Sequence, residues 1–230
     1  MKVLLSDLDL TCEMVRFLLK LPQDLSIVDA LARAEEMDVS LWPQLVSRRD
    51  GIDILHSGSI NPQAYLEPQQ VQGLIDFARS SYRALFFDMS GDLERHSLQV
   101  MQESKQVFAV CNPDAGSLHL GREKLQFLKT IGLSTRISAI VNRSDQALAV
   151  PSGKIEEFLG VPVAATFVDD TFEMNQSVQP AESLFAAKRK ETKLVRQFRA
   201  FVQELLQPRA RAAVAGGLAE AERDPHILWA

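Results

Sequence analysis

Short apolar segments alternate with amphipathic segments along most of this chain. The apolar segments have the length of strands and predict strands at 2–6, 53–56, 84–88, 107–111, 136–142 and 163–167. Helical periodicity between them predicts helices near 12–20, 26–36, 38–48, 68–80, 93–104, 117–131 and 152–159. Most of the strands are apolar throughout, as expected where crossover helices cover both faces of a parallel sheet. The pattern therefore predicts an α/β fold, with a doubly wound, mostly parallel sheet and helices on both faces.

Composition narrows the class of protein. The 230 residues are 46% hydrophobic and 24% charged, which is typical of a globular protein. No stretch approaches the ~20 apolar residues of a membrane span, so we expect no integral membrane segment. The early Asp7 argues against a signal peptide, and Cys12 and Cys111 are too few for a disulfide framework. We therefore expect a cytoplasmic protein.

Polar side chains follow several of the predicted strands. In chain order they are Asp7 and Asp9, then Asp88, then Asn142, then Asp169 and Asp170. Ligands of an open parallel sheet bind beyond the carboxyl ends of its strands, so these residues are candidates for one site. Carboxylates there suit Mg²⁺, which prefers hard oxygen ligands. Each residue also has a structural alternative, because Asp and Asn form turns and cap helices.

The order of these motifs resembles the ParA/MinD branch of P-loop ATPases, and within it the TadZ/CpaE type of pilus-assembly and localisation proteins. The resemblance runs from Lys2 to about Ala187. It rests on the Asp-x-Asp strand Val3–Leu10, Asp29–Leu31, Gly51–Leu55, the Walker B strand Tyr82–Asp88, Val107–Ser117, Ile140–Arg143, Leu159–Val163 and Val168–Asp170. It implies a nucleotide-binding domain over 1–187, ATP and Mg²⁺ as ligands, and a dimer or a heteromeric partner.

The same resemblance assigns roles to the acidic residues. Asp7 would support the metal shell, and Asp9 would position the attacking water. Asp88 would hold Mg²⁺ through water. These three residues are the catalytic and metal-binding candidates.

The resemblance also implies where the base would bind. Asn142, with Arg143 beside it, would hydrogen-bond the adenine. The loop formed by Val168, Asp169 and Asp170 would pack against the same ring. These five residues are the candidates for binding the nucleotide.

The sequence departs from the family pattern in one large respect. It begins at the second strand of the family and contains no Gly-rich loop ending in Gly-Lys-Ser/Thr, whose amides and Lys neutralise the phosphates. The nearest substitute, Gly116–Glu123, lies in a helical pattern. We therefore expect no ATP binding or hydrolysis by this chain, and an unpaired strand edge or a gap in its sheet. Two explanations remain: the sequence is truncated, or the protein is a nucleotide-free binding module. We favour truncation, because the Asp-x-Asp and Walker B carboxylates are present although the loop that they would serve is not.

A haloacid-dehalogenase-like phosphatase is a competing interpretation. Asp7 would then be the nucleophile, Asp9 the general acid and base, and Asp169 with Asp170 the Mg²⁺ ligands. Against it, Leu10 stands where that family usually has Gly. The further candidates for its Ser and Lys are Ser90, Lys105 and Lys124.

The C-terminal part differs in charge. Residues 188–213 contain eight basic and two acidic residues, although the whole chain has a net charge of −5. Residues 188–207 predict a basic amphipathic helix, which could bind an anionic membrane or DNA, or simply pack on the sheet. In the first case the protein would be a non-enzymatic localisation module that can sit peripherally at a membrane. Residues 208–230 are rich in Ala and Gly, and we expect a flexible tail.

Overall fold

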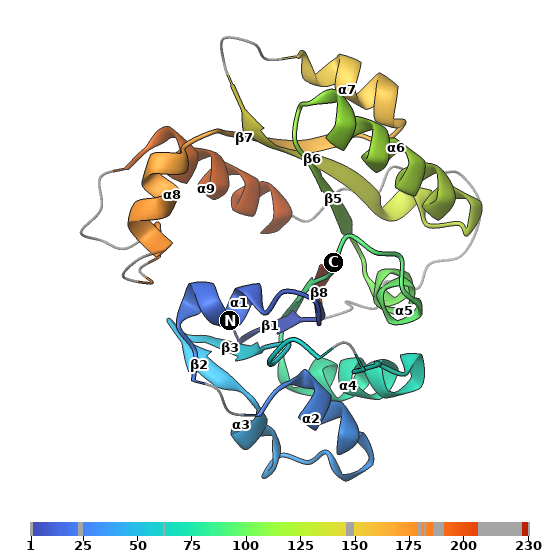
Figure 1. Cartoon of the computed structure of the whole chain (residues 1–230), viewed down its shortest axis with the longest axis vertical. Helices are drawn as coiled ribbons and strands as arrows, with labels where there is room; N and C mark the ends of the chain where they lie inside the picture. Colours follow the sequence, from blue (N-terminus) through green and yellow to red (C-terminus); the bar gives the residue numbers. More distant parts are fainter. Residues whose placement is uncertain are drawn as a thin grey trace, which may run out of the picture.

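The structure is a computed structural model, which describes residues 2–22, 25–61, 63–145, 150–178, 181, 183–185, 191–206 and 227–229. Figure 1 shows the elements in two groups, each built around one sheet. The strands are β1 (Val3–Asp7), β2 (Ser47–Arg49), β3 (Ile52–Leu55), β4 (Ala84–Asp88), β5 (Val107–Cys111), β6 (Ile137–Ser144), β7 (Val163–Val168) and β8 (Ile227–Trp229). The α-helices are α1 (Met14–Leu19), α2 (Ile27–Ala32), α3 (Trp42–Leu45), α4 (Pro68–Ser81), α5 (Arg95–Glu103), α6 (Ala115–Thr130), α7 (Ser152–Leu159), α8 (Thr171–Val178) and α9 (Lys193–Leu206).

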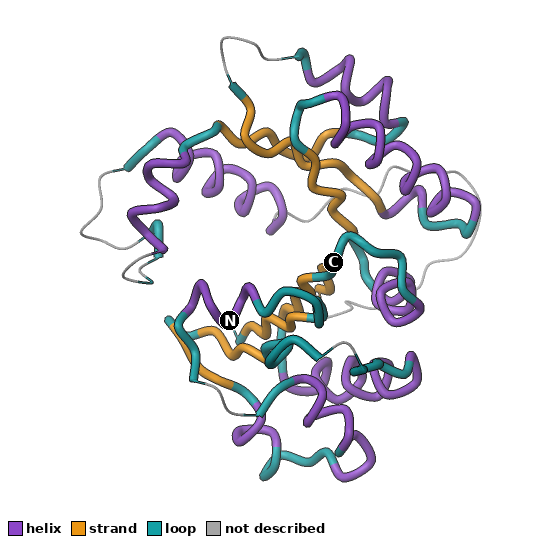
Figure 2. The backbone as a smooth tube through the Cα atoms, viewed as in Figure 1, coloured by secondary structure: helices purple, strands orange, loops and turns teal. Residues whose placement is uncertain are grey.

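The strands form two sheets, with the orders β2-β3-β1-β4-β8 and β5-β6-β7. β1 lies between β3 and β4 and is parallel to both, and the strands of the second sheet are also parallel. Figure 2 shows helices on both sides of the strands. These features confirm the predicted doubly wound α/β fold. The predicted break in the sheet is also present, because among the described strands only the three-residue β8 pairs with β4 on the side away from β1.

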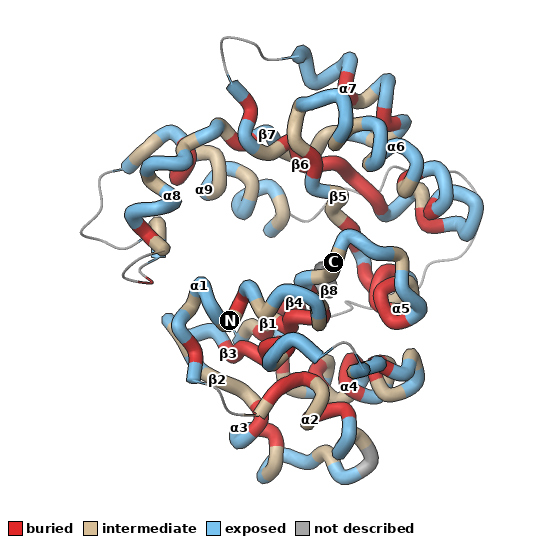
Figure 3. Tube along the Cα trace, viewed as in Figure 1, coloured by how far each residue is buried: buried red, intermediate tan, exposed pale blue. Residues whose placement is uncertain are grey.

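Successive residues of β1 point to opposite faces of the first sheet, and each face has its own apolar layer. Leu4 belongs to the larger core, which includes Val71 and Leu74 of α4. Leu5 packs instead with Val15 of α1. Figure 3 shows buried residues concentrated along the strands and the inner sides of these helices.

The second sheet is covered in the same way. α6 and α7 contribute Leu125, Leu128 and Leu159 to the core on one face. α9 covers the other face with Leu194 and Phe198. Both sheets are therefore covered by apolar layers on their two faces.

Local sequence explains where several helices begin and end. Ser26 and Asp29 form the capping box of α2, and Pro68 occupies the first turn of α4. Gly160 ends α7 in the left-handed region at φ 73°, where a glycine costs least.

The structure differs from the elements predicted from sequence in three places. The helix predicted over 38–48 is wrong for most of its length, because Asp38 accepts hydrogen bonds from the amides of Ser40 and Leu41 and forms a turn. Only the short α3 follows, and 47–49 pair antiparallel with β3 as β2. α8 was not predicted. Within the tail expected over 208–230, residues 227–229 form β8 and pair with β4, and the other residues of this tail lie outside those that the structure describes.

The predicted basic helix is present as α9, and Lys188, Arg189, Lys190, Arg209 and Arg211 lie outside the described residues. Its apolar side stacks on the second sheet, where the rings of Phe198 and Phe167 lie 4.1 Å apart. None of the helices in the described part of the chain is both long and apolar enough to cross a membrane.

Candidate functional site

The carboxyl ends of β1 and β4 bring two acids together. Asp7 and Asp88 are register partners across these parallel strands, each the last residue of its strand. The amide of Leu8 donates to the carbonyl of Asp88 over 2.8 Å, which extends the ladder one step beyond the strand. The predicted convergence of acids at this sheet edge is therefore present.

Asp7 is buried and held by two donors. Its Oδ1 accepts from the amide of Asp9 at 3.0 Å, and its Oδ2 accepts from the hydroxyl of Ser57 at 2.9 Å. Burial raises the pKa of Asp7 above its ordinary value, although these hydrogen bonds oppose the change. The carboxylate is fixed in position and costly to keep ionised without a counter-charge.

Asp9 lies after the end of β1, two residues beyond Asp7. Its Oδ1 accepts from the amide of Thr11 at 2.9 Å, and its Oδ2 accepts from the thiol of Cys12 at 2.9 Å. Partial burial would raise the pKa of Asp9, but these bonds outweigh it and hold the pKa below its ordinary value. The same contact raises the pKa of Cys12 to about 11, so this thiol is no nucleophile at neutral pH.

Asp88 opens onto a cavity of about 750 Å³ between β4, β5 and α6. Its side chain reaches solvent at the mouth, yet the surrounding protein removes part of its hydration. This desolvation, followed by the charges of Asp7 and Asp9, raises the pKa of Asp88 to about 6. No residue in the described part of the chain donates a hydrogen bond to this carboxyl group. Asp88 is thus the acid of the three whose charge has least compensation.

The three acids fit a hydrated divalent cation better than a closed metal site. Among the described residues, no group of three or more His, Cys, Asp or Glu side chains forms a metal site by itself. Mg²⁺, however, usually keeps several waters and takes only one or two carboxylates from the protein. Asp88 and Asp7 would hold it, and the ion would supply charge neutralisation at this sheet edge.

Sequence reasoning missed Ser57 and the cavity beside Asp88. Ser57 follows the end of β3 and is buried, so the rule that sites gather at strand ends could have found it. The same cavity is lined by Ser90 and by Lys124 of α6, whose Nζ donates to the carbonyl of Gly91. These two residues were candidates in the phosphatase interpretation, and the fold places both near Asp88.

The residues expected to bind adenine lie elsewhere. Asn142 lies within β6, and not after it, and lines an apolar cavity of about 380 Å³ with Phe86 and Phe198. Arg143 is exposed and adopts a left-handed backbone at φ 52°. The pairing of β6 with β7 is irregular between Val141 and Ser144, which accommodates that conformation.

The aspartates after β7 accept hydrogen bonds at the start of α8, where Asp170 caps the helix. Asp169 accepts from the hydroxyl of Thr171 at 2.8 Å, and Asp170 accepts from the amide of Glu173 at 3.1 Å, at the start of α8. Val168 donates its amide to the side chain of Gln197 on α9. Both aspartates follow β7 of the second sheet, whereas Asp7 ends β1 of the first sheet.

We compared the chain with known proteins. No family model matches it, and no curated protein matches it. Among solved structures, a ParA family ATPase from Chlorobium tepidum TLS is 21% identical, with 88% of this chain and 85% of that chain covered and a TM-score of 0.77. The septum site-determining protein MinD from Pyrococcus horikoshii OT3, complexed with Mg-ADP, is 20% identical, with coverages of 90% and 84% and a TM-score of 0.72. The MinC:MinD cell division protein complex of Aquifex aeolicus matches at 17% identity, 89% and 83% coverage, and a TM-score of 0.70.

This chain has the ParA/MinD fold. The similarity covers 88% of this chain and therefore includes strands of both sheets. The segment Gly116–Glu123, the nearest sequence to a phosphate-binding loop, lies inside α6 of this fold. It is helical, as expected, and presents no loop of amides to a phosphate.

Proposed function

We propose that this chain is a ParA/MinD-type factor that positions other molecules or helps to assemble a pilus or secretion system. In this proposal it acts through protein contacts and does not hydrolyse ATP as the 230 residues stand. The TadZ/CpaE-like order of motifs supports this subgroup. A cytoplasmic site of action, with peripheral attachment to a membrane, belongs to the same proposal.

One observation carries the proposal. Asp7 and Asp88 meet at adjacent strand ends of a ParA/MinD fold, as the acidic half of a Mg²⁺–nucleotide site would. The sequence contains no Gly-rich loop with a terminal Gly-Lys-Ser/Thr to hold the phosphates. Without those amides and that Lys, the three acids would repel a triphosphate and not bind it.

Calorimetry with ATP in millimolar Mg²⁺ tests the proposal. We expect no heat of binding and no phosphate release above the protein-free rate. The Asp88→Asn variant is the matched control, because it removes one acid and should leave both results unchanged. Binding at micromolar ATP that weakens in Asp88→Asn would overturn the proposal and indicate a competent ATPase.

A second candidate is the Mg²⁺-dependent phosphatase. The observation that favours it is the cavity in which Asp88, Ser90 and Lys124 meet. The hydrogen bonds that Asp169 and Asp170 accept at the start of α8 weigh against it. Turnover of an aryl phosphate with Mg²⁺, abolished by Asp7→Asn but retained in Asp169→Asn, would favour a phosphatase built on β1 and β4. Absence of turnover would remove this candidate.

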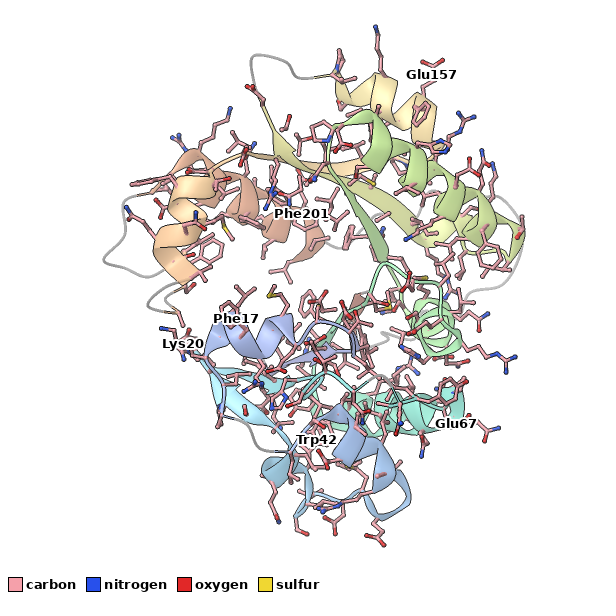
Figure 4. All side chains as sticks on the ribbon, in the orientation of Figure 1. Phe17, Lys20, Trp42, Glu67, Glu157 and Phe201 are labelled. Carbon is pink, nitrogen blue, oxygen red and sulfur yellow. The ribbon has the colours of Figure 1, made fainter. Side chains whose placement is uncertain are left out.

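We further propose that a dimer or a heteromeric partner covers the exposed apolar side chains of α1 and α8. Phe17 is 65% exposed and points away from the first sheet (Figure 4), and Phe172 is 73% exposed. Light scattering should show a mass above that of a monomer, and Phe17→Glu with Phe172→Glu should reduce it. The control is Val39→Glu, because the side chain of Val39 is 82% exposed and lies outside α1 and α8. Phe77 would not serve as a control, since its ring packs on the core.

A further inference from the structure

The two sheets leave a rift between β4 and β5. β4 pairs along its full length with β1, but on its other edge only Ala84–Phe86 have partners among the described residues. β5 pairs with β6 and with no other described strand. The cavity of about 750 Å³ lies between these edges and is lined by Phe86–Asp88 from one strand and Val107–Cys111 from the other.

The lining of the rift suits a strand. Parallel strands are normally covered by pairing on both edges and by apolar layers on both faces, and unpaired edges expose backbone groups that other strands can bind. Val110, the next-to-last residue of β5, is 62% exposed and borders both the larger cavity and the apolar cavity of about 380 Å³. An apolar extended segment would satisfy both the backbone groups and these side chains.

The chain supplies such a segment from its own C-terminal part. Ile227, Leu228 and Trp229 pair in parallel with Ala84–Phe86 as β8. Leu206, the last residue of α9, borders the apolar cavity that also contains Ala84. Twenty residues separate Leu206 from Ile227, and a segment of that length can extend over up to roughly 70 Å.

A strand of three residues binds weakly by itself. Each hydrogen bond contributes only about 0.5–1.5 kcal/mol net, so a free peptide of this length would not stay bound at micromolar concentration. The covalent connection raises the effective concentration of the segment to about the millimolar range. The segment is therefore held by its tether and can be released without unfolding the sheets.

We infer that the rift between β4 and β5 is a strand-binding groove, and that its resident occupant is the C-terminal segment of the same molecule. The docked segment contacts the strand that carries Asp88 two residues further on. Release of the segment opens the β4 edge for another extended chain.

The test compares the 230-residue chain with its double variant Ile227→Pro, Leu228→Pro. Consecutive residues of a strand donate to opposite sides, so one of the two prolines removes a donor that β8 needs for β4. A matched control places prolines at Gly216 and Gly217, in the same segment but outside β8. The probe is a fluorescent peptide with the sequence of residues 223–230.

We expect the peptide, titrated to millimolar concentration, to bind the variant several-fold more tightly than the wild type or the control, because the tethered segment competes in those proteins. A peptide carrying the same two prolines should bind none of them. Equal affinity of the first peptide for all three proteins, or no binding to any, would overturn the inference.

Two measurements on the wild-type chain keep the inference testable if the variant does not fold. Hydrogen exchange should show protection of the amides of 227–229, and exchange at the rate of an unfolded peptide would overturn it. Light scattering over a range of concentrations distinguishes docking in the same molecule from exchange between two copies. A dimer that the prolines at 227 and 228 abolish would show that the occupant comes from a second copy, which contradicts the inference.

Discussion

Asp7 and Asp88 stand opposite each other as register partners at the carboxyl ends of β1 and β4, one buried and one at the mouth of a cavity. Their charges repel, and no described side chain donates to Asp88. The pair is therefore a source of instability whenever both carboxyl groups are ionised, unless a cation lies between them.

The pH dependence of stability should reveal this pair. Because the pKa of Asp88 is raised to about 6, its contribution to stability is present below the ordinary carboxyl pKa and is lost as the pH rises through about 6. Asp88→Asn should thus increase the free energy of unfolding by on the order of 1 kcal/mol near pH 8, after allowance for solvent exposure, and by little near pH 4. Urea denaturation at both pH values measures it. Asp92→Asn, which makes the same change of charge in the following exposed loop, should show no such difference between the two pH values.

Mg²⁺ should relieve the same repulsion. We expect millimolar MgCl₂ to raise the melting temperature of the wild type by a few degrees near neutral pH, and to raise that of Asp88→Asn less. NaCl at equal ionic strength is the control for general screening. An identical effect of Mg²⁺ and NaCl would show that the acids do not hold the cation.

The convergence of Asp7 and Asp88 could be predicted because it depends only on strand direction. Both residues end apolar segments, and parallel strands place their carboxyl ends at one edge. The fold class followed from the same alternation of strands and helices. What Asp88 faces could not be predicted, since the cavity is formed by β5 and α6, which are distant in sequence.

The strands β2 and β8 could not be predicted from the local sequence pattern. β2 consists of Ser47, Arg48 and Arg49, which have no apolar pattern and form a strand only because the edge of β3 is available. β8 likewise depends on the free edge of β4, which the local sequence of the tail does not encode. From sequence, Asp169 and Asp170 were equally compatible with capping a helix and with binding a ligand. The structure shows that both accept hydrogen bonds at the start of α8, a helix that was not predicted.

Two linked and buried hydrogen bonds, which join Trp42, Tyr82 and Asp53, should be important for stability. The hydroxyl of Tyr82 accepts from the indole Nε1 of Trp42 at 2.6 Å and donates to Asp53 at 2.7 Å. Tyr82→Phe leaves the indole and the carboxylate each without this partner, which should cost about 1–3 kcal/mol of unfolding free energy. Tyr65→Phe is the control, because Tyr65 is 55% exposed and its loss should change stability by less than about 0.5 kcal/mol. Urea denaturation followed by the fluorescence of Trp42 measures both, and equal effects would contradict the assignment.

The polar side of α9 provides the test of an anionic binding surface. Lys193, Arg196 and Arg199 are exposed, while Leu194 and Val195 are buried against the second sheet. Lys193→Glu with Arg196→Glu should therefore leave the fold intact but reduce retention on vesicles containing anionic lipid by at least about tenfold, since each basic residue near such a surface contributes about 1 kcal/mol. Lys129→Glu with Lys154→Glu makes the same change of net charge on α6 and α7 and should retain binding. If both double variants lose retention equally, net charge and not α9 governs the attraction; if neither does, α9 serves only to cover the sheet.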